Sequence, residues 1–276
     1  MRKKKTPIWK TFYIVAVCII VLIFIGPILW LLSASIKTQA DAISIPPVLL
    51  FQPTLANFEK IFLKEPFLVF LKNSTIVAVS STLLALIIGL PAAYALGRFR
   101  FRGKKDLAFW VISTQMFPAI TVALPYILIM KNLGLIDTQW ALIITHITFN
   151  LPFAVWLLQG FVSEIPPELD EAVLVDGGTR LDVLLRIVLP LSAPGIAATA
   201  IFCIITSWNE FLFALFLAPF HAKTLPVAAV GLISFGNIFW GHIGAASAVI
   251  VVPIFIFAMI VQRYMVRGLS FGAVKG

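Results

Sequence analysis

The sequence predicts an all-α integral membrane protein with six transmembrane helices and with both termini in the cytoplasm. Of its 276 residues, 61% are hydrophobic and only 12% are charged, whereas soluble domains contain roughly half and a quarter. The mean hydropathy of +1.03 means that a folded monomer would expose a large apolar surface to water. Aromatic residues make up 13% of the chain, which excludes an intrinsically disordered protein because disordered chains are poor in them.

Six long apolar stretches are nearly free of charged residues and can cross about 30 Å of hydrocarbon as helices. The first stretch follows a run of basic residues, but it is longer than a signal-peptide core of about 7–15 residues, so we expect it to remain as a span. In the third stretch, Pro118 and Pro125 predict either a hinge or two simple kinks. The predicted transmembrane helices are residues 11–32, 74–96, 107–130, 140–162, 196–217 and 241–266.

Basic residues set the predicted orientation of these spans. If the N-terminus lies inside the cell, 15 of the 21 Lys and Arg residues fall in cytoplasmic segments, as the positive-inside rule requires. The C-terminal tail, residues 267–276, and a long loop at residues 163–194 are then cytoplasmic. The net charge of +9 is therefore a topology signal, and we do not interpret it as nucleic-acid binding.

The loop at residues 163–194 has a helical pattern of its own. Pro167 suits the first turn of a helix, where its missing N–H costs nothing, and Gly177 suits the end of a helix because glycine readily takes positive φ. A second helix is predicted over residues 179–189. The apolar face of the first helix is expected to consist of Leu169, Ala172 and Val173.

Charged side chains are concentrated in the same loop. Asp182 and Arg186 predict an i, i+4 ion pair on the second helix. A plain return to the membrane needs only a few residues, so a docking element for a cytoplasmic partner is favoured over a merely solvated loop. Six of the 12 acidic residues are expected on its solvated face: Glu164, Glu168, Asp170, Glu171, Asp176 and Asp182.

The motif in this loop resembles a family signature. Glu171-Ala172-Val173, three residues, Gly177, nine residues and Ile187-Val188-Leu189-Pro190 look like the EAA loop of ATP-binding-cassette (ABC) importer permeases, EAA-x3-G-x9-I-x-LP. The spacing matches throughout, and Val173 stands where the family has alanine. Further segments resemble the maltose-type carbohydrate permease subunits, at residues 73–74, 94–99, 151–158, 207–211 and 262–276.

The resemblance implies a single permease domain over residues 1–276 that forms half of a transmembrane pathway for a carbohydrate or polyol. Such a subunit works in a bacterial or archaeal cytoplasmic membrane with a second homologous permease, two ATPase subunits and an extracytoplasmic solute-binding protein. Its EAA loop is a coupling helix that contacts the ATPase. By matched position, the expected ATPase contacts are Glu171, Ala172, Asp176, Gly177, Ile187, Leu189 and Pro190, with a second contact on the tail at Gly268, Gly272 and Lys275.

Neither a nucleotide site nor a metal site is expected in this chain. Residues 97–105 come nearest to a phosphate-binding loop, but five residues separate the glycines instead of four, and Lys105 replaces Ser or Thr. His146, His221 and His242 are scattered without metal-ligand spacing. We therefore expect no enzyme activity and no cofactor here. The resemblance implies that ATP and Mg²⁺ bind to the partner ATPase subunits.

Glu210, within the fifth span, is the intramembrane residue of most interest because a charge in hydrocarbon is costly and usually functional. It either faces a polar path or bonds across the permease pair, or else it reaches the headgroups or braces a neighbouring helix. In maltose-type systems the sugar is held mainly by the other permease subunit, which disfavours solute contact here. The candidate residues of the translocation path are Phe117, Asn150, Trp208, Asn209 and Glu210.

A stand-alone, ion-coupled secondary transporter is the alternative interpretation. It predicts internal repeats, broken helices and several acids within the membrane, whereas Glu210 is the clear intramembrane acid and no repeat is evident. An intramembrane enzyme would need a nucleophile–base or metal set within the spans, and the sequence offers none. The outer segment at residues 219–226 either touches the solute-binding protein, as it does in related permeases, or is an ordinary hairpin.

Overall fold

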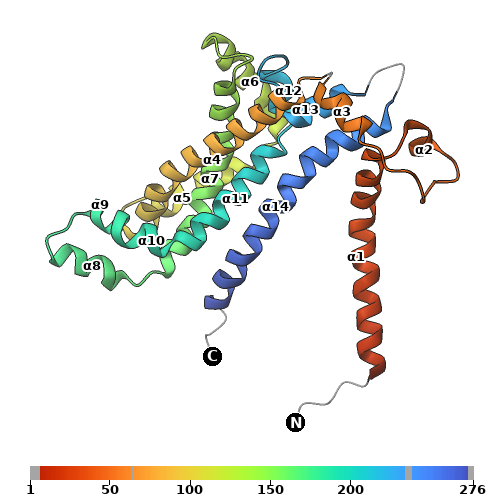
Figure 1. The fold of residues 1–276 in the computed structure, drawn as a ribbon. Helices are drawn as coiled ribbons and strands as arrows, with labels where there is room; N and C mark the ends of the chain where they lie inside the picture. Colours follow the sequence, from red (N-terminus) through yellow and green to blue (C-terminus); the bar gives the residue numbers. More distant parts are fainter. Residues whose placement is uncertain (1–6, 64, 234–237, 273–276) are drawn as a thin grey trace. The chain divides into compact units, whose positions relative to one another are not determined.

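The computed structural model describes residues 7–63, 65–233 and 238–272. This part of the chain consists of helices and their connections, with one isolated β-bridge between Ile233 and Ile238 (Figure 1). The prediction of an all-α fold is confirmed. The chain divides into two compact units, the first made of Met1–Phe67 and Ala229–Val252 and the second of Leu68–Ala228 and Pro253–Gly276.

The first unit contains α1 (Pro7–Ser35), α2 (Gln39–Ile43), α3 (Ala56–Leu63) and the start of α14 (Trp240–Gly272). The most apolar window of α1 has a mean hydropathy of 3.1 and holds no buried residue. A helix that is hydrophobic all round and unburied needs an apolar solvent. The side chains of α1 therefore suit contact with lipid.

The turn after α1 is held by a buried lysine. Lys37 is 2% exposed, its Nζ donates to the Val48 carbonyl at 2.8 Å, and the ammonium lies 4.4 Å from the centroid of the Trp30 ring. Asn57 Nδ2 donates to the carbonyls of Ser35 at 2.9 Å and Lys37 at 2.8 Å. A carbonyl oxygen and a ring face thus replace water around the cation, and the amide ties α3 to the end of α1.

The second unit holds most of the helical bundle. Its long members are α4 (Phe67–Arg98), which begins at the unit boundary, α7 (Gln139–Glu164) and α11 (Ala193–Trp208). The shorter elements are α5 (Lys104–Ser113), η1 (Thr114–Met116), α6 (Ala119–Asn132), α8 (Pro167–Val175), α9 (Arg180–Val183), the π-helical turn η2 (Leu184–Val188), α10 (Leu189–Leu191), α12 (Leu212–Leu217) and α13 (Leu225–Gly231), the last crossing into the first unit.

Four helices among the described residues, α1, α4, α7 and α14, are long and apolar enough to cross a membrane. Two further candidates are bent pairs: α5 and η1 meet α6 at 95°, and the segment from α9 to α10 meets α11 at 76°. By length and composition the described chain therefore has between four and six spans, and the membrane-protein class is confirmed.

The stretch at residues 107–130, where the sequence predicts one continuous span, is two helices that meet at Phe117 and Pro118. Phe117 is extended, with φ −71° and ψ 128°. Proline disfavours the α conformation in the residue before it and cannot donate a helical hydrogen bond. The bend thus lies at Pro118, one of the two prolines singled out as a hinge, while Pro125 lies inside α6.

The stretch at residues 196–217 is also interrupted. α11 ends at Trp208, where Asn209 Nδ2 donates to the Ile205 carbonyl at 2.9 Å. α12 begins at Leu212, and the carboxylate of Glu210 accepts hydrogen bonds from its first turn. Polar side chains at 209 and 210 satisfy backbone groups on both sides of the break.

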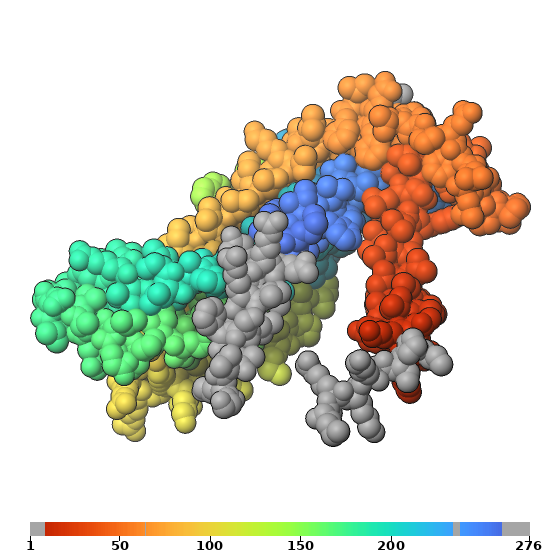
Figure 2. Space-filling model, turned by 60° about the horizontal axis from the view of Figure 1, so that its bottom comes forward, coloured from red at the N-terminus to blue at the C-terminus, as the bar shows by residue number. Residues whose placement is uncertain are grey.

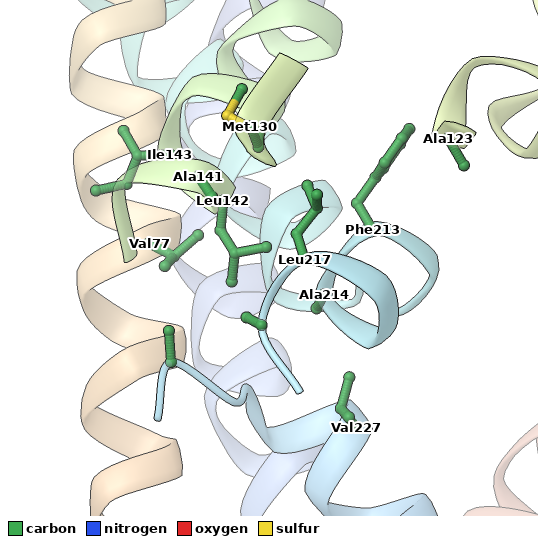
Figure 3. Packing of buried hydrophobic residues seen from close by; sticks show 12 residues of the cluster. Val77, Ala123, Met130, Ala141, Leu142, Ile143, Phe213, Ala214, Leu217 and Val227 are labelled. Carbon is green, nitrogen blue, oxygen red and sulfur yellow. The ribbon is translucent and has the colours of Figure 1, made fainter. Parts of the chain in front are cut away.

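Two hydrophobic cores lie within the second unit. The α12 core joins α12 to α6 and α7: it contains Phe213 and Leu217 of α12, Met130 of α6 and Leu142 of α7, as Figure 3 shows. The loop core joins α4 and α7 to the helical loop through Tyr94, Leu158, Val162, Val183 and Val188. The loop at residues 163–194 is therefore packed onto the bundle on one of its faces.

α4 packs closely on α7 at two glycines. A Cβ atom on Gly89 would lie 3.3 Å from Ala154 Cβ, and one on Gly97 would lie 3.0 Å from Val162 Cγ1. Small residues at helix contacts let two backbones approach, which is the usual source of helix association in membranes. These contacts bring the end of α4 next to the start of the helical loop.

Candidate functional site

The helical loop at residues 163–194 is built around one glycine turn. α8 begins at Pro167 and ends at Val175, and Gly177 follows with φ +82°, a conformation that L-residues other than glycine rarely adopt. The N–H of Gly178 donates to the Val173 carbonyl at 2.9 Å. A Cβ on Gly178 would lie 2.6 Å from Val173 Cγ1, so both glycines are needed for the turn.

The second half of the loop departs from the predicted single helix. The predicted ion pair is confirmed, with Arg186 Nη2 3.1 Å from Asp182 Oδ1, and Asp182 also forms a capping box with Thr179. The helix does not stop before Pro190 as predicted. The chain widens into the π turn η2 and continues into α10, which contains Pro190, because a wider turn removes the clash that proline makes in a regular α-helix.

The expected ATPase-contacting residues occupy the outer surface of this loop. Ile187 is half-buried against the loop core. The remaining six are exposed: Glu171, Ala172, Asp176, Gly177, Leu189 and Pro190. Figure 2 shows α8 and the segment after it forming a continuous surface at one end of the second unit. This surface is accessible to a partner protein.

Asp170 corrects the predicted orientation of α8. It was expected on the solvated face, but it is buried, at 3% exposed, and Arg98 Nε lies 3.1 Å from its Oδ2. Tyr94 Oη donates to the same oxygen at 3.5 Å, and Arg98 Nη2 donates to the Ile165 carbonyl. A charged partner supplied by α4 turns the acid inward.

The inward face of α8 is therefore Asp170, Val173 and Leu174, which repeat at i, i+3 and i+4. Val173 and Leu174 pack on the loop core, whereas Leu169 and Ala172, expected on the apolar face, are exposed. The signal was present in the sequence, because Asp170 shares a helical face with Val173 and Leu174.

A second candidate site is a cavity of about 420 Å³ at the bend between η1 and α6. Its wall is mostly apolar and includes aromatic rings, with a few hydroxyl, amide and carboxylate groups among them, as is typical of ligand pockets. Its lining residues are Thr114, Gln115, Phe117, Ala119, Val122, Tyr126, Thr148, Phe149, Thr206, Glu210 and Phe213. The break in the third stretch and the break in the fifth stretch thus open onto one cavity.

Glu210 both lines this cavity and organises its wall. Its Oε1 accepts the Phe213 N–H at 2.8 Å and its Oε2 accepts the Ala214 N–H at 3.0 Å, so it caps α12. His146 Nε2 lies 3.5 Å from Oε2, and the His146 ring packs 5.0 Å from that of Phe149. The carboxylate is thereby held between α12 and α7.

Of the five residues predicted for the translocation path, Phe117 and Glu210 line the cavity. Asn150 lies outside the cavity: its Nδ2 donates to Ser207 Oγ at 2.8 Å, within a buried polar group between α7 and α11. Trp208 is buried, with its ring 6.4 Å from that of Phe257, and Asn209 caps α11. The cavity residues that sequence reasoning left out of this set are Thr114, Gln115, Ala119, Val122, Tyr126, Thr148, Phe149, Thr206 and Phe213.

The predicted tail contacts fall at the end of α14. Gly268 and Gly272 belong to this helix, which ends at Gly272, and Lys275 lies outside the described residues. No group of three or more potential metal ligands occurs within residues 7–63, 65–233 and 238–272.

The segment at residues 219–226 is anchored by a carboxylate. Asp137, at φ +60°, accepts the backbone N–H of Phe220 at 3.0 Å and of His221 at 2.9 Å, and its Oδ2 lies 2.5 Å from His221 Nδ1. Burial alone would raise the pKa of Asp137, but the hydrogen bonds from His221, Phe220 and Ala222 hold it below its ordinary value. The segment is therefore tied to the connection between α6 and α7.

A bundle of long apolar helices, with a helix–glycine–helix loop packed on it and an open, mostly apolar cavity beside two helix breaks, fits the permease class of membrane protein. Residues 85–271 match the family model described as "Binding-protein-dependent transport system inner membrane component". The chain belongs to this family, the permease subunits of ABC importers, and is a multi-pass protein of the inner membrane.

Curated relatives and solved structures agree with this assignment. The chain is 35% identical to the inner membrane ABC transporter permease protein YcjP of Escherichia coli, over 100% of both chains. It is 35% identical to the trehalose/maltose transport system permease protein MalG of Thermococcus litoralis, over 95% of this chain and 96% of that one. A crystal structure of a bacterial ABC transporter that imports alginate contains a chain of the same fold, with a TM-score of 0.79, 24% identity and coverage of 96% and 99%.

Proposed function

We propose that this chain forms half of the transmembrane pathway of an ATP-driven importer for a carbohydrate or a related polyol. The observation that carries this proposal is the family match over residues 85–271, which includes the whole helical loop. Relatives that are 35% to 38% identical are named for trehalose and maltose, for trehalose, and for diacetylchitobiose. The alternative of a stand-alone secondary transporter has no comparable support.

The proposed complex contains a second, homologous permease, two ATPase subunits that bind ATP and Mg²⁺, and an extracytoplasmic solute-binding protein. The whole chain acts as one permease domain with six spans and both ends in the cytoplasm. Four long helices and two bent pairs, together with the distribution of basic residues, support this topology. A bent helix is tolerated in a membrane where it lines a water-filled cavity, because water can hydrogen-bond the backbone groups that the bend leaves unpaired.

Coupling to the ATPase is proposed to occur at the helical loop and at the end of α14. The exposed carboxylate of Glu171 and the turn at Gly177 form its contact surface. Reversal of the charge in Glu171→Lys should abolish uptake while insertion into the membrane stays normal, because Glu171 has no packing role in the loop core. Wild-type uptake by an inserted Glu171→Lys protein would exclude this contact. Glu168→Lys, also on an exposed residue of α8, is the matched control.

The cavity is proposed to lie along the solute pathway. Aromatic rings at Phe117, Tyr126 and Phe149 can stack on the apolar face of a sugar ring, and the hydroxyls of Thr148 and Thr206 can bond its hydroxyls. The position of α11 is then held by three residues outside the cavity lining, Asn150, Trp208 and Asn209. Tyr126 is already oriented by its hydroxyl, which donates to Thr148 Oγ1 at 2.7 Å.

The proposal is tested by purifying the tagged chain from its native host in mild detergent and identifying its companions. We expect an ATPase, a second permease and, after reconstitution with the solute-binding protein, ATP-dependent uptake of one sugar from a panel of trehalose, maltose and diacetylchitobiose. Glucosylglycerol and sorbitol extend the panel to polyols. A chain that purifies alone and carries solute into vesicles without ATP would overturn the proposal and support the secondary transporter.

A further inference from the structure

α4 carries side-chain contacts to a loop at each of its ends. It is one helix of 32 residues, so it is about 48 Å long at 1.5 Å per residue. Its last turn meets the helical loop through what we name the loop joint, Tyr94 and Arg98 with Ile165 and Asp170. Its other end meets the segment at residues 219–226 through what we name the far joint, Asn73 and Ser74.

The loop joint is a buried ion pair. The side chains of Arg98 and Asp170 are 11% and 5% exposed, with Nε and Oδ2 3.1 Å apart. Asp170 Oδ1 is buried with no hydrogen-bond partner among the residues that the structure describes. Its charge therefore depends on Arg98, since a buried carboxylate without a partner is strongly unfavourable. Displacement of α8 must either move α4 or break this pair.

The far joint binds the backbone of the segment at residues 219–226, and Asn73 Oδ1 also accepts a hydrogen bond from Gln139 Nε2 of α7 at 2.7 Å. Asn73 Nδ2 donates to the carbonyls of His221 and Lys223, both at 3.0 Å. Ser74 Oγ accepts the Leu225 N–H at 2.8 Å. Three backbone groups of the segment are therefore bound by two adjacent residues of α4, so the segment follows this end of the helix.

We propose that the loop joint transmits movement of α8 to α4, and that α4 passes it through Asn73 to the segment at residues 219–226. Arg98 and Asn73 are then positioning residues for transport: they touch neither ATP nor solute, and they connect the ATPase-facing loop to the opposite end of the subunit. This inference rests on the proposed function, in which α8 contacts an ATPase and the segment at residues 219–226 faces the solute-binding protein.

The first test removes the ion pair without leaving a buried charge. Arg98→Met with Asp170→Leu replaces two buried charges by apolar side chains, a change that buried pairs often tolerate. In proteoliposomes that hold the complete complex, we expect basal ATP hydrolysis to persist. Stimulation by solute-loaded binding protein and the number of solutes carried per ATP should each fall about tenfold, within the usual range of coupling between two sites.

Arg186→Met is the matched control, because it removes an arginine from an ion pair of the same loop that is largely exposed. It should leave stimulation and the ratio of solute to ATP within about twofold of the wild type, as expected for a surface pair. A doubly apolar variant with wild-type stimulation and ratio would overturn the proposal.

The second test acts at the far joint and does not depend on the loop core. Asn73→Ala should cause the same loss of stimulation in an assembled complex, and adding it to the doubly apolar variant should cause no further loss, because both changes interrupt one connection. Losses that multiply would overturn the proposal. If the doubly apolar variant fails to assemble, Asn73→Ala is still a sufficient test, because normal stimulation in that variant would overturn the proposal.

Failure of this inference is distinct from failure of the proposed function. A wild-type complex without ATP-dependent uptake of any sugar in the panel refutes the proposed function before any variant is measured. A wild-type complex that is active, with variants that are equally well coupled, refutes only the transmission through α4.

Discussion

Two carboxylates, at the two ends of the second unit, are taken out of water in different ways. Asp170 in the helical loop has one charged partner, Arg98 of α4. Asp137, in the connection between α6 and α7, is held by several backbone N–H groups of residues 220–222 and by the ring of His221. The first arrangement concentrates the stabilisation in one charged side chain, with the Tyr94 hydroxyl as a neutral second donor. The second distributes it over the backbone. The comparison therefore predicts unequal sensitivity to substitution at the two ends.

The largest effect is expected for Arg98→Ala. It leaves the Asp170 carboxylate buried and unpaired, which costs ~3–5 kcal/mol when one partner of a buried ion pair is removed. The measurement is the unfolding midpoint of the purified complex in mild detergent, with Arg186→Ala as the control on an exposed arginine. Equal midpoints for the two variants would mean that water or another group compensates Asp170, and the contrast with Asp137 would disappear.

A smaller effect is expected for Asp137→Asn. The amide oxygen still accepts hydrogen bonds from the backbone N–H groups of the segment, but the charge is lost, so about 1.5 kcal/mol of stability should go with it. Protease cleavage within residues 219–226 of the intact complex measures this local loosening. Asp106→Asn, on an exposed residue of α5, should cleave at the wild-type rate. A loss as large as that of Arg98→Ala would remove the distinction between concentrated and distributed stabilisation.

A glycine substitution tests the turn that presents the outer face of α8. Gly177→Ala places a Cβ at φ +82° and should cost ~1 kcal/mol, because left-handed backbone disfavours L-residues. Gly160→Ala, in the interior of α7 with open space around its Cβ, should be neutral or slightly stabilising. The same unfolding midpoint reports both, and a Gly177→Ala protein as stable as Gly160→Ala would show that the turn relaxes without cost.

The smallest effect is expected from a fall in pH, which should loosen the segment at residues 219–226 only under acid conditions. The pKa of Asp137 lies below its ordinary value of 3.8 in the folded protein, so its contribution to stability is complete above about pH 5 and is lost as the pH falls through the folded pKa. Cleavage within residues 219–226 should therefore rise below pH 4 in the wild type. Asp137→Asn should show no such rise, and an identical acid response in both proteins would place the titrating group elsewhere.

Much of the helical loop follows from local sequence. The start of α8 at Pro167, the turn at Gly177 and the pair of Asp182 and Arg186 each depend on residues within four positions of one another. The inward turn of Asp170 depends on Arg98, which is 72 positions earlier in the chain. No local window contains both, so the acid was expected in solvent. Helix periodicity places Asp170 on the same face as Val173 and Leu174, and this was the one feature of the sequence that indicated a buried Asp170.

The cavity was less predictable because it draws on several separate elements. Phe117 and Glu210 attract attention in the sequence as a residue before proline and as an intramembrane acid. Gln115 and Thr206 carry no such signal. Gln115 lies just before the 95° bend at Pro118 and Thr206 lies on α11, and the fold brings both to the same cavity. The bend itself was expected as one of two alternatives, but its angle depends on packing against α7 and α12 that no residue pattern specifies.

The glycine contacts of α4 with α7 have a consequence for the kind of motion that the helix allows. Gly89 and Gly97 are eight residues apart, as are their partners Ala154 and Val162. The two close contacts are therefore formed together in one register of the two helices. A slide by one turn, about 5.4 Å, would bring Ala93 to the place of Gly97 and drive its methyl group into Val162. A slide of α4 along α7 is therefore disfavoured unless Val162 shifts, whereas a change of tilt that keeps both contacts in register is not opposed by them.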